Sequence, residues 1–111
     1  MSIETVPFKI SDHDKDCLRI IITGKFGGTE AASVREAINK YLDSDFDTIY
    51  IDAKDVTETD LSGMNEVIHA HHVLDITAKK LIFVYQRDSA VEKWVETTGL
   101  DKFVSTAIIP A

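Results

Sequence analysis

The chain has 111 residues, of which 44% are hydrophobic and 28% charged, and its 19 acidic and 12 basic residues give a formal charge of −7. This length and apolar share are typical of one globular domain over residues 1–111, and the acidic balance disfavours nucleic acids, whose binding depends on basic side chains. Because no apolar run approaches the roughly 20 residues that cross a bilayer, and the start lacks a signal peptide, we expect a cytoplasmic protein without membrane insertion.

Two strands are predicted first. Residues 5–10 alternate weakly between apolar and polar side chains and predict an edge strand, whereas residues 17–23 are dense in β-branched side chains and predict a buried strand. The acidic stretch 11–16 predicts the hairpin tip between them. Cys17 is the single cysteine, so an internal disulfide is excluded, and its apolar neighbours indicate a buried side chain.

A helix is expected after the glycines of residues 24–28. Thr29 or Ser33 is placed to cap it, because a hydroxyl oxygen can accept a hydrogen bond from the first helical turn. Apolar side chains then recur every three or four residues, as on one face of a helix: Val34, Ile38, Tyr41 and Leu42.

A third strand and a second helix follow. Residues 48–52 predict a short buried strand that ends in an acid, and a loop rich in Asp and Thr comes after it. Residues 61–76 carry apolar side chains at helical spacing, and Asp60 or Ser62 stands where it can cap the first turn.

The last third of the chain completes an α/β domain. Residues 80–85 predict a buried strand, Ser89 and Glu92 form a capping box, Gly99 ends that helix, and residues 104–109 supply a last strand. The order β-β-α-β-α-β-α-β predicts a mixed sheet of four to five strands with about three helices, joined by right-handed crossovers.

The first turn of the 61–76 helix is the most informative stretch. Free backbone N–H groups and the positive end of the helix dipole tolerate an anion there, including a phosphate on Ser62. Since Glu58 and Asp60 lie close before it, a phosphate would add about −1.5 to −2 charge to a negative surface and repel a bound partner. Local sequence alone also allows the simpler interpretation that Asp60 and Ser62 only begin a helix.

The helix start reads Asp60-Leu61-Ser62-Gly63-Met64, which is an acid, one residue, Ser-Gly and an apolar residue. This motif resembles the helix start of the STAS family, the domain of bacterial anti-sigma factor antagonists. Residues 91–100 are similar to its third helix and Gly-Leu terminus. The motifs have the family's spacing and strand order, so the resemblance covers nearly the whole chain and implies a single STAS-like domain.

This resemblance implies a partner switch without a cofactor or enzymatic activity. Ser62 would be the phosphoacceptor, the unphosphorylated form would bind an anti-sigma factor that is also a serine protein kinase, and phosphorylation would release it. A PP2C-type phosphatase would act on phosphorylated Ser62. The implied partner-binding surface is the segment around the helix start: Glu58, Thr59, Asp60, Leu61, Ser62, Gly63, Met64, Asn65 and Glu66.

The sequence departs from the family pattern in three places. Leu61 replaces the Ser or Thr that often precedes the phosphoacceptor, which leaves Ser62 as the one hydroxyl directly before the glycine. Asn65 stands where a small residue usually follows Gly63-Met64, and Glu66 comes after it, so we expect a more polar exposed helix edge. The acid often found after the second strand is absent, and residues 27–28 are glycines instead.

Other acidic and histidine patterns offer weaker alternatives. Glu66, His69 and His72 recur every three residues, a spacing used in metal sites, but three or four ligands are needed and no further motif supplies them. We expect a solvated face with His71 against the core. A metal- or pH-responsive module built on His69 and His72 is the least favoured function.

Two phosphate- and cation-binding patterns are also incomplete. Asp12, Asp14 and Asp16 alternate like a calcium loop but lack its central glycine and its bidentate acid. Asp52 and Asp55, at the predicted end of a strand, suggest the phosphoaccepting site of receiver domains, yet receivers open with a strand and a helix rather than two strands.

Enzymatic activity is not expected. Ser62 has an acidic neighbour rather than a positioned base, and Cys17 lies in a predicted buried strand, which disfavours a reactive thiol. Trp94 and Phe103 are expected in the core. The main functional alternative is a STAS adaptor subunit of a transporter or other complex that acts without phosphorylation.

Overall fold

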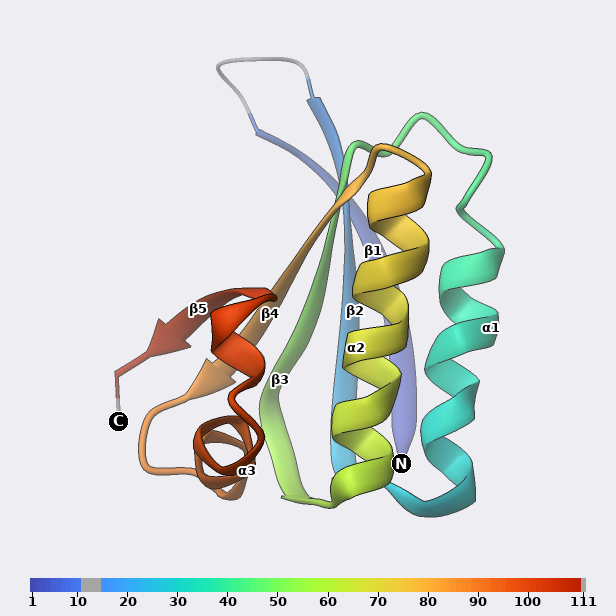
Figure 1. Cartoon of the computed structure of the whole chain (residues 1–111). Coiled ribbons are helices and arrows are strands. Elements are labelled where there is room, and N and C mark those ends of the chain that lie inside the picture. The colour runs from blue at the N-terminus through green and yellow to red at the C-terminus, as the bar shows by residue number, and fades with distance from the viewer. Residues whose placement is uncertain (11–14, 111) are drawn as a thin grey trace.

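A computed structural model describes residues 1–10 and 15–110, with side chains described except at residues 9, 10, 15 and 16. A single sheet holds five strands in chain order (Figure 1). They are β1 (Ser2–Ile10), β2 (Lys15–Phe26), β3 (Thr48–Thr59), β4 (Lys80–Gln86) and β5 (Ser105–Ile109). β1 pairs antiparallel with β2, and all other neighbours are parallel, so the predicted mixed sheet is confirmed.

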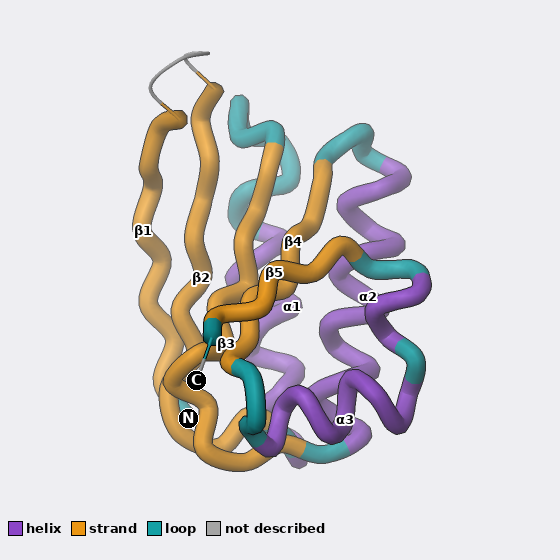
Figure 2. The backbone as a smooth tube through the Cα atoms, turned by 90° about the vertical axis from the view of Figure 1, so that its left-hand side faces the viewer, coloured by secondary structure: helices purple, strands orange, loops and turns teal. Residues whose placement is uncertain are grey.

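The helices lie on one side of this sheet (Figure 2). They are α1 (Ser33–Asn39), α2 (Leu61–Ile76) and α3 (Ala90–Thr98), with short 3₁₀ turns η1 (Gly28–Ala32) before α1 and η2 (Leu100–Lys102) after α3. α1 and α2 run side by side, and α3 packs against α2, β3 and β4. The opposite face of the sheet carries no helix of the described chain.

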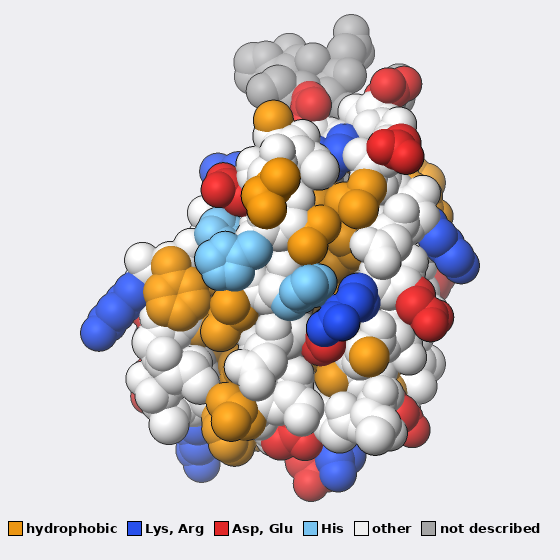
Figure 3. Space-filling view, turned by 45° about the vertical axis from the view of Figure 1, so that its right-hand side comes forward, with side chains coloured by type: hydrophobic (Ala, Val, Ile, Leu, Met, Phe, Trp, Pro, Cys, Tyr) orange, Lys and Arg blue, Asp and Glu red, His pale blue; other side chains and the backbone are white. Residues whose placement is uncertain are grey.

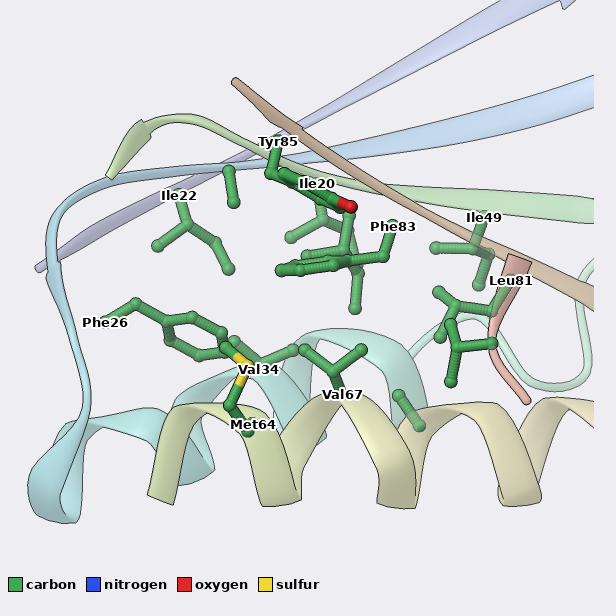
Figure 4. Packing of buried hydrophobic residues seen from close by; sticks show 14 of the residues in the cluster. Ile20, Ile22, Phe26, Val34, Ile49, Met64, Val67, Leu81, Phe83 and Tyr85 are labelled. Carbon is green, nitrogen blue, oxygen red and sulfur yellow. The ribbon is translucent and has the colours of Figure 1, made fainter. Parts of the chain in front are cut away.

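The core lies between the sheet and α1 and α2 (Figure 4). Ile20 of β2 and Phe83 of β4 point from the sheet toward Met64 and Val67 of α2, and all four side chains are fully buried. Each such side chain stabilises the fold by about 1.5–3 kcal/mol relative to an exposed one. The apolar periodicity of residues 61–76 therefore faces the sheet, which fixes the start of α2 against the end of β2.

The first helix begins differently from the prediction. The residues before η1 and α1 are Gly27 and Ala32, and neither makes a side-chain cap, so the expected caps at Thr29 and Ser33 are wrong. Ala32 already has helical backbone angles, with φ −62° and ψ −18°. Because the chain enters α1 through a 3₁₀ turn, the preceding carbonyls serve the N–H groups that a cap would otherwise bind.

The loop predicted after residue 52 is also wrong. β3 continues to Thr59 and pairs with β2 along this whole stretch, with register shifts that accommodate its length. Ala53, Val56 and Thr59 are buried, whereas the intervening side chains are half-buried or exposed. Because these intervening side chains are polar, residues 53–59 contain no apolar run that would predict a strand.

The C-terminal half follows the prediction more closely. The Ser89 hydroxyl accepts a hydrogen bond from the Glu92 N–H at 3.2 Å, and the left-handed Gly99, with φ 69°, ends α3. The Glu92 carboxylate accepts from the Asp88 N–H rather than closing the box on Ser89. Phe103 is 49% exposed, contrary to the expected core position, because Leu100 of η2 fills the core there.

Candidate functional site

Asp60 caps α2 and joins it to a distant turn. One carboxylate oxygen, Oδ1, accepts a hydrogen bond from the Gly63 N–H at 3.1 Å, and Oδ2 accepts one from the Gly28 N–H at 3.0 Å. Of the two residues that the sequence predicts as possible caps, Asp60 and Ser62, the cap is therefore Asp60. One side chain thus holds the start of α2 and the start of η1 together, although they are 32 residues apart.

Two glycines make this arrangement possible by leaving space. A Cβ on Gly27 would lie 2.5 Å from all three carboxyl atoms of Asp60, and a Cβ on Gly63 would lie 2.5 Å from the carbonyl oxygen of Phe26 and the hydroxyl of Thr59. Gly27 has an extended backbone, so its need is for space and not for a special φ. The glycines at 27 and 28, a departure from the family pattern, are thus part of the site.

The Asp60 carboxylate is kept ionised by its surroundings. The Gly63 N–H does most to lower the pKa of Asp60, desolvation opposes it, and the N–H groups of Gly28 and Ser62 and the charge of Lys25 lower the pKa further. At neutral pH this side chain is an anion that occupies donors of the first helical turn. A second anion arriving at Ser62 therefore meets a negative charge already in place.

Ser62 lies in the exposed part of this helix start. Among the described residues its hydroxyl has no hydrogen-bond partner. Leu61 beside it is 54% exposed, which is unusual for a large apolar side chain at a charged surface. The site thus offers an accessible hydroxyl, an apolar neighbour and a fixed carboxylate.

The structure divides the predicted partner-binding surface in two. Its accessible members are Glu58, Asp60, Leu61, Ser62 and Asn65. The remaining members are buried and support the site from below: Thr59, Gly63, Met64 and Glu66. The sequence did not predict that Lys25 belongs to the site. Its charge helps to lower the pKa of Asp60, and it lines a hollow of about 310 Å³ with Gly27, Gly28 and neighbouring residues.

Glu66 does not form the polar exposed edge that the sequence predicted. It is 9% exposed, and its Oε1 pairs with the Arg35 guanidinium of α1 at 2.8 Å. The helical period places residue 66 three positions after the buried Gly63 and four before the buried Ala70, at one edge of the buried side of α2, where it reaches Arg35 of α1. Glu66 therefore joins two helices.

The histidines lie on the surface of α2, where Figure 3 shows imidazoles beside basic and apolar side chains. His69 and His72 are exposed, and His71, which the sequence predicts to lie against the core, is half-buried. Within residues 1–10 and 15–110, no group of three or more His, Cys, Asp or Glu side chains is arranged to hold a metal ion. The pairing of Glu66 with Arg35 also removes the carboxylate that the metal pattern required.

Asp52 has a structural role. It is 3% exposed in the middle of β3, where Oδ1 accepts from the Lys54 N–H at 3.0 Å and Oδ2 accepts from the side chains of Arg19 and Lys54. Burial raises the pKa of Asp52, but these donors outweigh burial and leave the pKa lowered. The receiver-like interpretation required Asp52 at the end of a strand, and Asp52 instead lies buried within β3, which continues to Thr59.

Two other sequence predictions have different outcomes. Cys17 is buried as expected, at 1% exposure. The calcium-like pattern of Asp12, Asp14 and Asp16 falls outside the described residues or side chains. Among the described residues, none of the helices combines the length and apolar character that crossing a membrane requires.

The fold is similar to that of solved anti-sigma factor antagonists, which agrees with the STAS-like fold implied by the sequence motifs. An anti-sigma factor antagonist from Mycobacterium paratuberculosis is similar with a TM-score of 0.74 at 21% identity, over 95% of this chain and 85% of that one. The anti-sigma factor antagonist SpoIIAA, in its unphosphorylated form, matches with a TM-score of 0.73 at 17% identity, over 96% of this chain and 88% of its own.

A third solved structure, a candidate anti-sigma factor antagonist from Thermotoga maritima, has a TM-score of 0.74 at 13% identity over 94% of this chain and 85% of that one. No protein-family model and no curated protein matches the chain. At these identities the likeness is one of fold, so the activity has to be argued from the site.

Proposed function

We propose that this chain is an anti-sigma factor antagonist, a cytoplasmic regulator that binds an anti-sigma factor with serine kinase activity and is released when Ser62 is phosphorylated. One observation carries the proposal: Ser62 is exposed in the first turn of α2, directly beside a carboxylate that already accepts hydrogen bonds from the Gly63 N–H of that turn and from the Gly28 N–H of η1. The three structural neighbours, all antagonists or candidate antagonists, support the same class.

The charge arrangement explains how phosphate would act as a switch. Asp60 holds the N–H groups of Gly63 and Gly28, so the phosphate could not take these donors without displacing it. About −1.5 to −2 additional charge would then project outward, toward the partner, beside Asp60 and the exposed Glu58. Because the Asp60 cap is retained, α2 keeps its structure while the surface it presents changes.

The unphosphorylated surface suits a protein partner. Leu61 offers an apolar contact beside Ser62, and Glu58 and Asn65 offer polar contacts around it. Interfaces commonly place such an apolar residue at the centre and polar residues at the rim. A PP2C-type phosphatase that removes the phosphate from Ser62 would restore this surface and complete the cycle, in which the chain itself performs no catalysis.

Phosphate mapping tests the proposal. The partner is isolated with the chain from the source cell, incubated with the chain and ATP, and the product is digested and sequenced by mass spectrometry. We expect one phosphate on Ser62 in the wild type and none in Ser62→Ala. Thr57→Ala is the matched control, since Thr57 is an exposed hydroxyl residue close by on β3, and it should be modified like the wild type. Modification of another residue, or of none, would overturn the proposal.

A further inference from the structure

β1 is an edge strand of the sheet and leaves one of its sides unpaired. It pairs antiparallel with β2 from Ser2 to Ile10, and no other strand of the described chain lies beside it (Figure 2). An edge strand leaves every second residue with a backbone N–H and C=O group that no neighbouring strand binds. Such groups are met by water, or by another extended chain that lies alongside.

Pro7 identifies which residues of β1 carry the free groups. It lies opposite Leu18 inside an uninterrupted register, although proline has no N–H to donate. Proline is accepted in a paired edge strand where its nitrogen points away from the neighbouring strand. Because the backbone direction alternates along an antiparallel pair, the N–H and C=O groups of Ile3 and Thr5 point to the free side as well. Pro7 itself offers no donor there, so the part of the edge that can accept a further strand is residues 2–6.

A groove runs beside the same two residues, between β1 and α1. Ile3 and Thr5 line it on the strand side, and Ala37 and Tyr41 line it on the helix side. Ile3, Ala37 and Tyr41 are half-buried against the core, so they offer apolar surface to the groove. Its volume is about 250 Å³, which is below the roughly 300–1,000 Å³ of pockets for drug-sized molecules. The groove therefore suits the side chains of a strand that lies along β1.

The charges around this edge define the side chains that fit. Side chains alternate between the two faces of a strand, so the exposed Glu4 lies on the face opposite the groove. An added strand places one side chain beside Glu4 and its two neighbours in the groove, where Glu36 and Lys40 offset each other. Opposite charges across two strands stabilise the pair, and a net charge of −7 attracts a basic segment. The matching pattern is apolar, basic, apolar.

We propose that a partner protein adds an extended segment antiparallel to residues 2–6 of β1, with two apolar side chains in the groove and a basic side chain between them beside Glu4. A peptide backbone is the occupant because its N–H and C=O groups have the spacing of the free groups on Ile3 and Thr5. A second copy of the chain is a poorer occupant, since it would bring two charges of −7 together. The inference uses neither Ser62 nor Asp60, so it goes beyond the proposed function and does not depend on it.

Three peptides with the same side chains and charge test the strand addition. The probe is Lys-Val-Lys-Val-Lys, with a fluorescent label at its N-terminus and an amide at its C-terminus, and its binding to the full chain is followed by anisotropy. One control carries N-methyl groups on both valines, whose N–H groups would face β1, and should bind at least about tenfold more weakly. The other carries N-methyl groups on the central and last lysines, whose N–H groups would face away, and should bind like the probe. Equal binding of all three peptides would mean attraction by charge alone and would overturn the proposal.

Variants and amide exchange place the probe on the protein. Ala37→Phe should fill the groove and weaken binding at least about tenfold, whereas Asn39→Phe, at an exposed position of α1 that lines the cleft toward α2, should bind like the wild type. In the wild type, the probe should slow hydrogen exchange of the Ile3 and Thr5 amides, which needs no variant to fold. The proposal is overturned if the probe does not bind, if exchange at both amides is unchanged, or if sedimentation without peptide shows a dimer that Ala37→Phe abolishes, which would assign the edge to a second copy. None of these outcomes affects phosphate mapping of Ser62, so the two proposals fail separately.

Discussion

Replacing Gly27 by Ala tests whether the Asp60 clamp holds the site together. The added methyl would lie 2.5 Å from the Asp60 carboxyl, so the carboxylate must move and release both the Gly63 and the Gly28 N–H groups. Loss of the helix cap costs about 1–2 kcal/mol of unfolding free energy, and loss of the hydrogen bond to Gly28 costs about 0.5–1.5 kcal/mol more. The reduced freedom of the unfolded chain on replacing glycine by alanine offsets about 0.4–1 kcal/mol of this cost. We therefore expect the free energy of unfolding to fall by about 1.5 kcal/mol and the Tm to fall by about 5–10 °C.

A double-mutant cycle isolates the clamp in this prediction. Urea unfolding, followed by the fluorescence of the single Trp94, gives the free energy of unfolding for Gly27→Ala, Asp60→Ala and the double variant. Because Asp60→Ala removes the obstructed carboxylate, Gly27→Ala should cost almost nothing in that background. Gly99→Ala is the matched control, since its cost arises from a left-handed φ of 69° and should add to that of Asp60→Ala. Equal costs of Gly27→Ala in both backgrounds would refute the reasoning.

Three further predictions concern the supports of the site. The fold lowers the pKa of Asp52 and Asp60 below the unfolded value of about 3.9, so the free energy of unfolding should be level above about pH 5 and fall as pH drops through 4; a level profile to pH 3 would contradict this. Arg35→Ala leaves the Glu66 carboxylate buried without its partner and should cost about 1–3 kcal/mol in thermal unfolding, and adding Glu66→Gln should recover part of that loss; no recovery would exclude the ion pair as the cause. Gly63→Ala places a methyl 2.5 Å from a backbone oxygen and should cost about 1–3 kcal/mol by urea unfolding, so a variant as stable as wild type would be inconsistent with the observed packing.

The strongly periodic parts of the sequence predicted the fold well. The apolar spacing of residues 61–76 gave α2 within its observed bounds, and Ser89 and Gly99 marked the start and end of α3 through local hydrogen bonding and backbone conformation. These signals are local, because a helix face or a cap involves residues three or four apart. The order of elements then left few topologies for the sheet.

Features that depend on distant residues were missed. The second half of β3 is paired with β2, and the sequence around residues 53–59 gives no sign of this partner. In the sequence Glu66 has the pattern of an exposed helix residue, and only the fold brings it beside Arg35, which is 31 positions earlier. Asp60 was correctly expected as one of two caps, but its second hydrogen bond, to Gly28, exists only once two loops meet in the fold.

The central claim is tested most directly by measuring how the charge at residue 62 changes partner binding. Titration calorimetry with the isolated partner compares wild type, Ser62→Ala and Ser62→Asp, with thermal unfolding to show that each variant is within about 1 kcal/mol of wild type, since an acid is tolerated near a helix N-terminus. We predict that Ser62→Ala binds like the wild type and that Ser62→Asp binds at least about tenfold more weakly, a loss of about 1.4 kcal/mol. Equal affinity of all three folded proteins would contradict the switch and favour an adaptor that acts without phosphorylation.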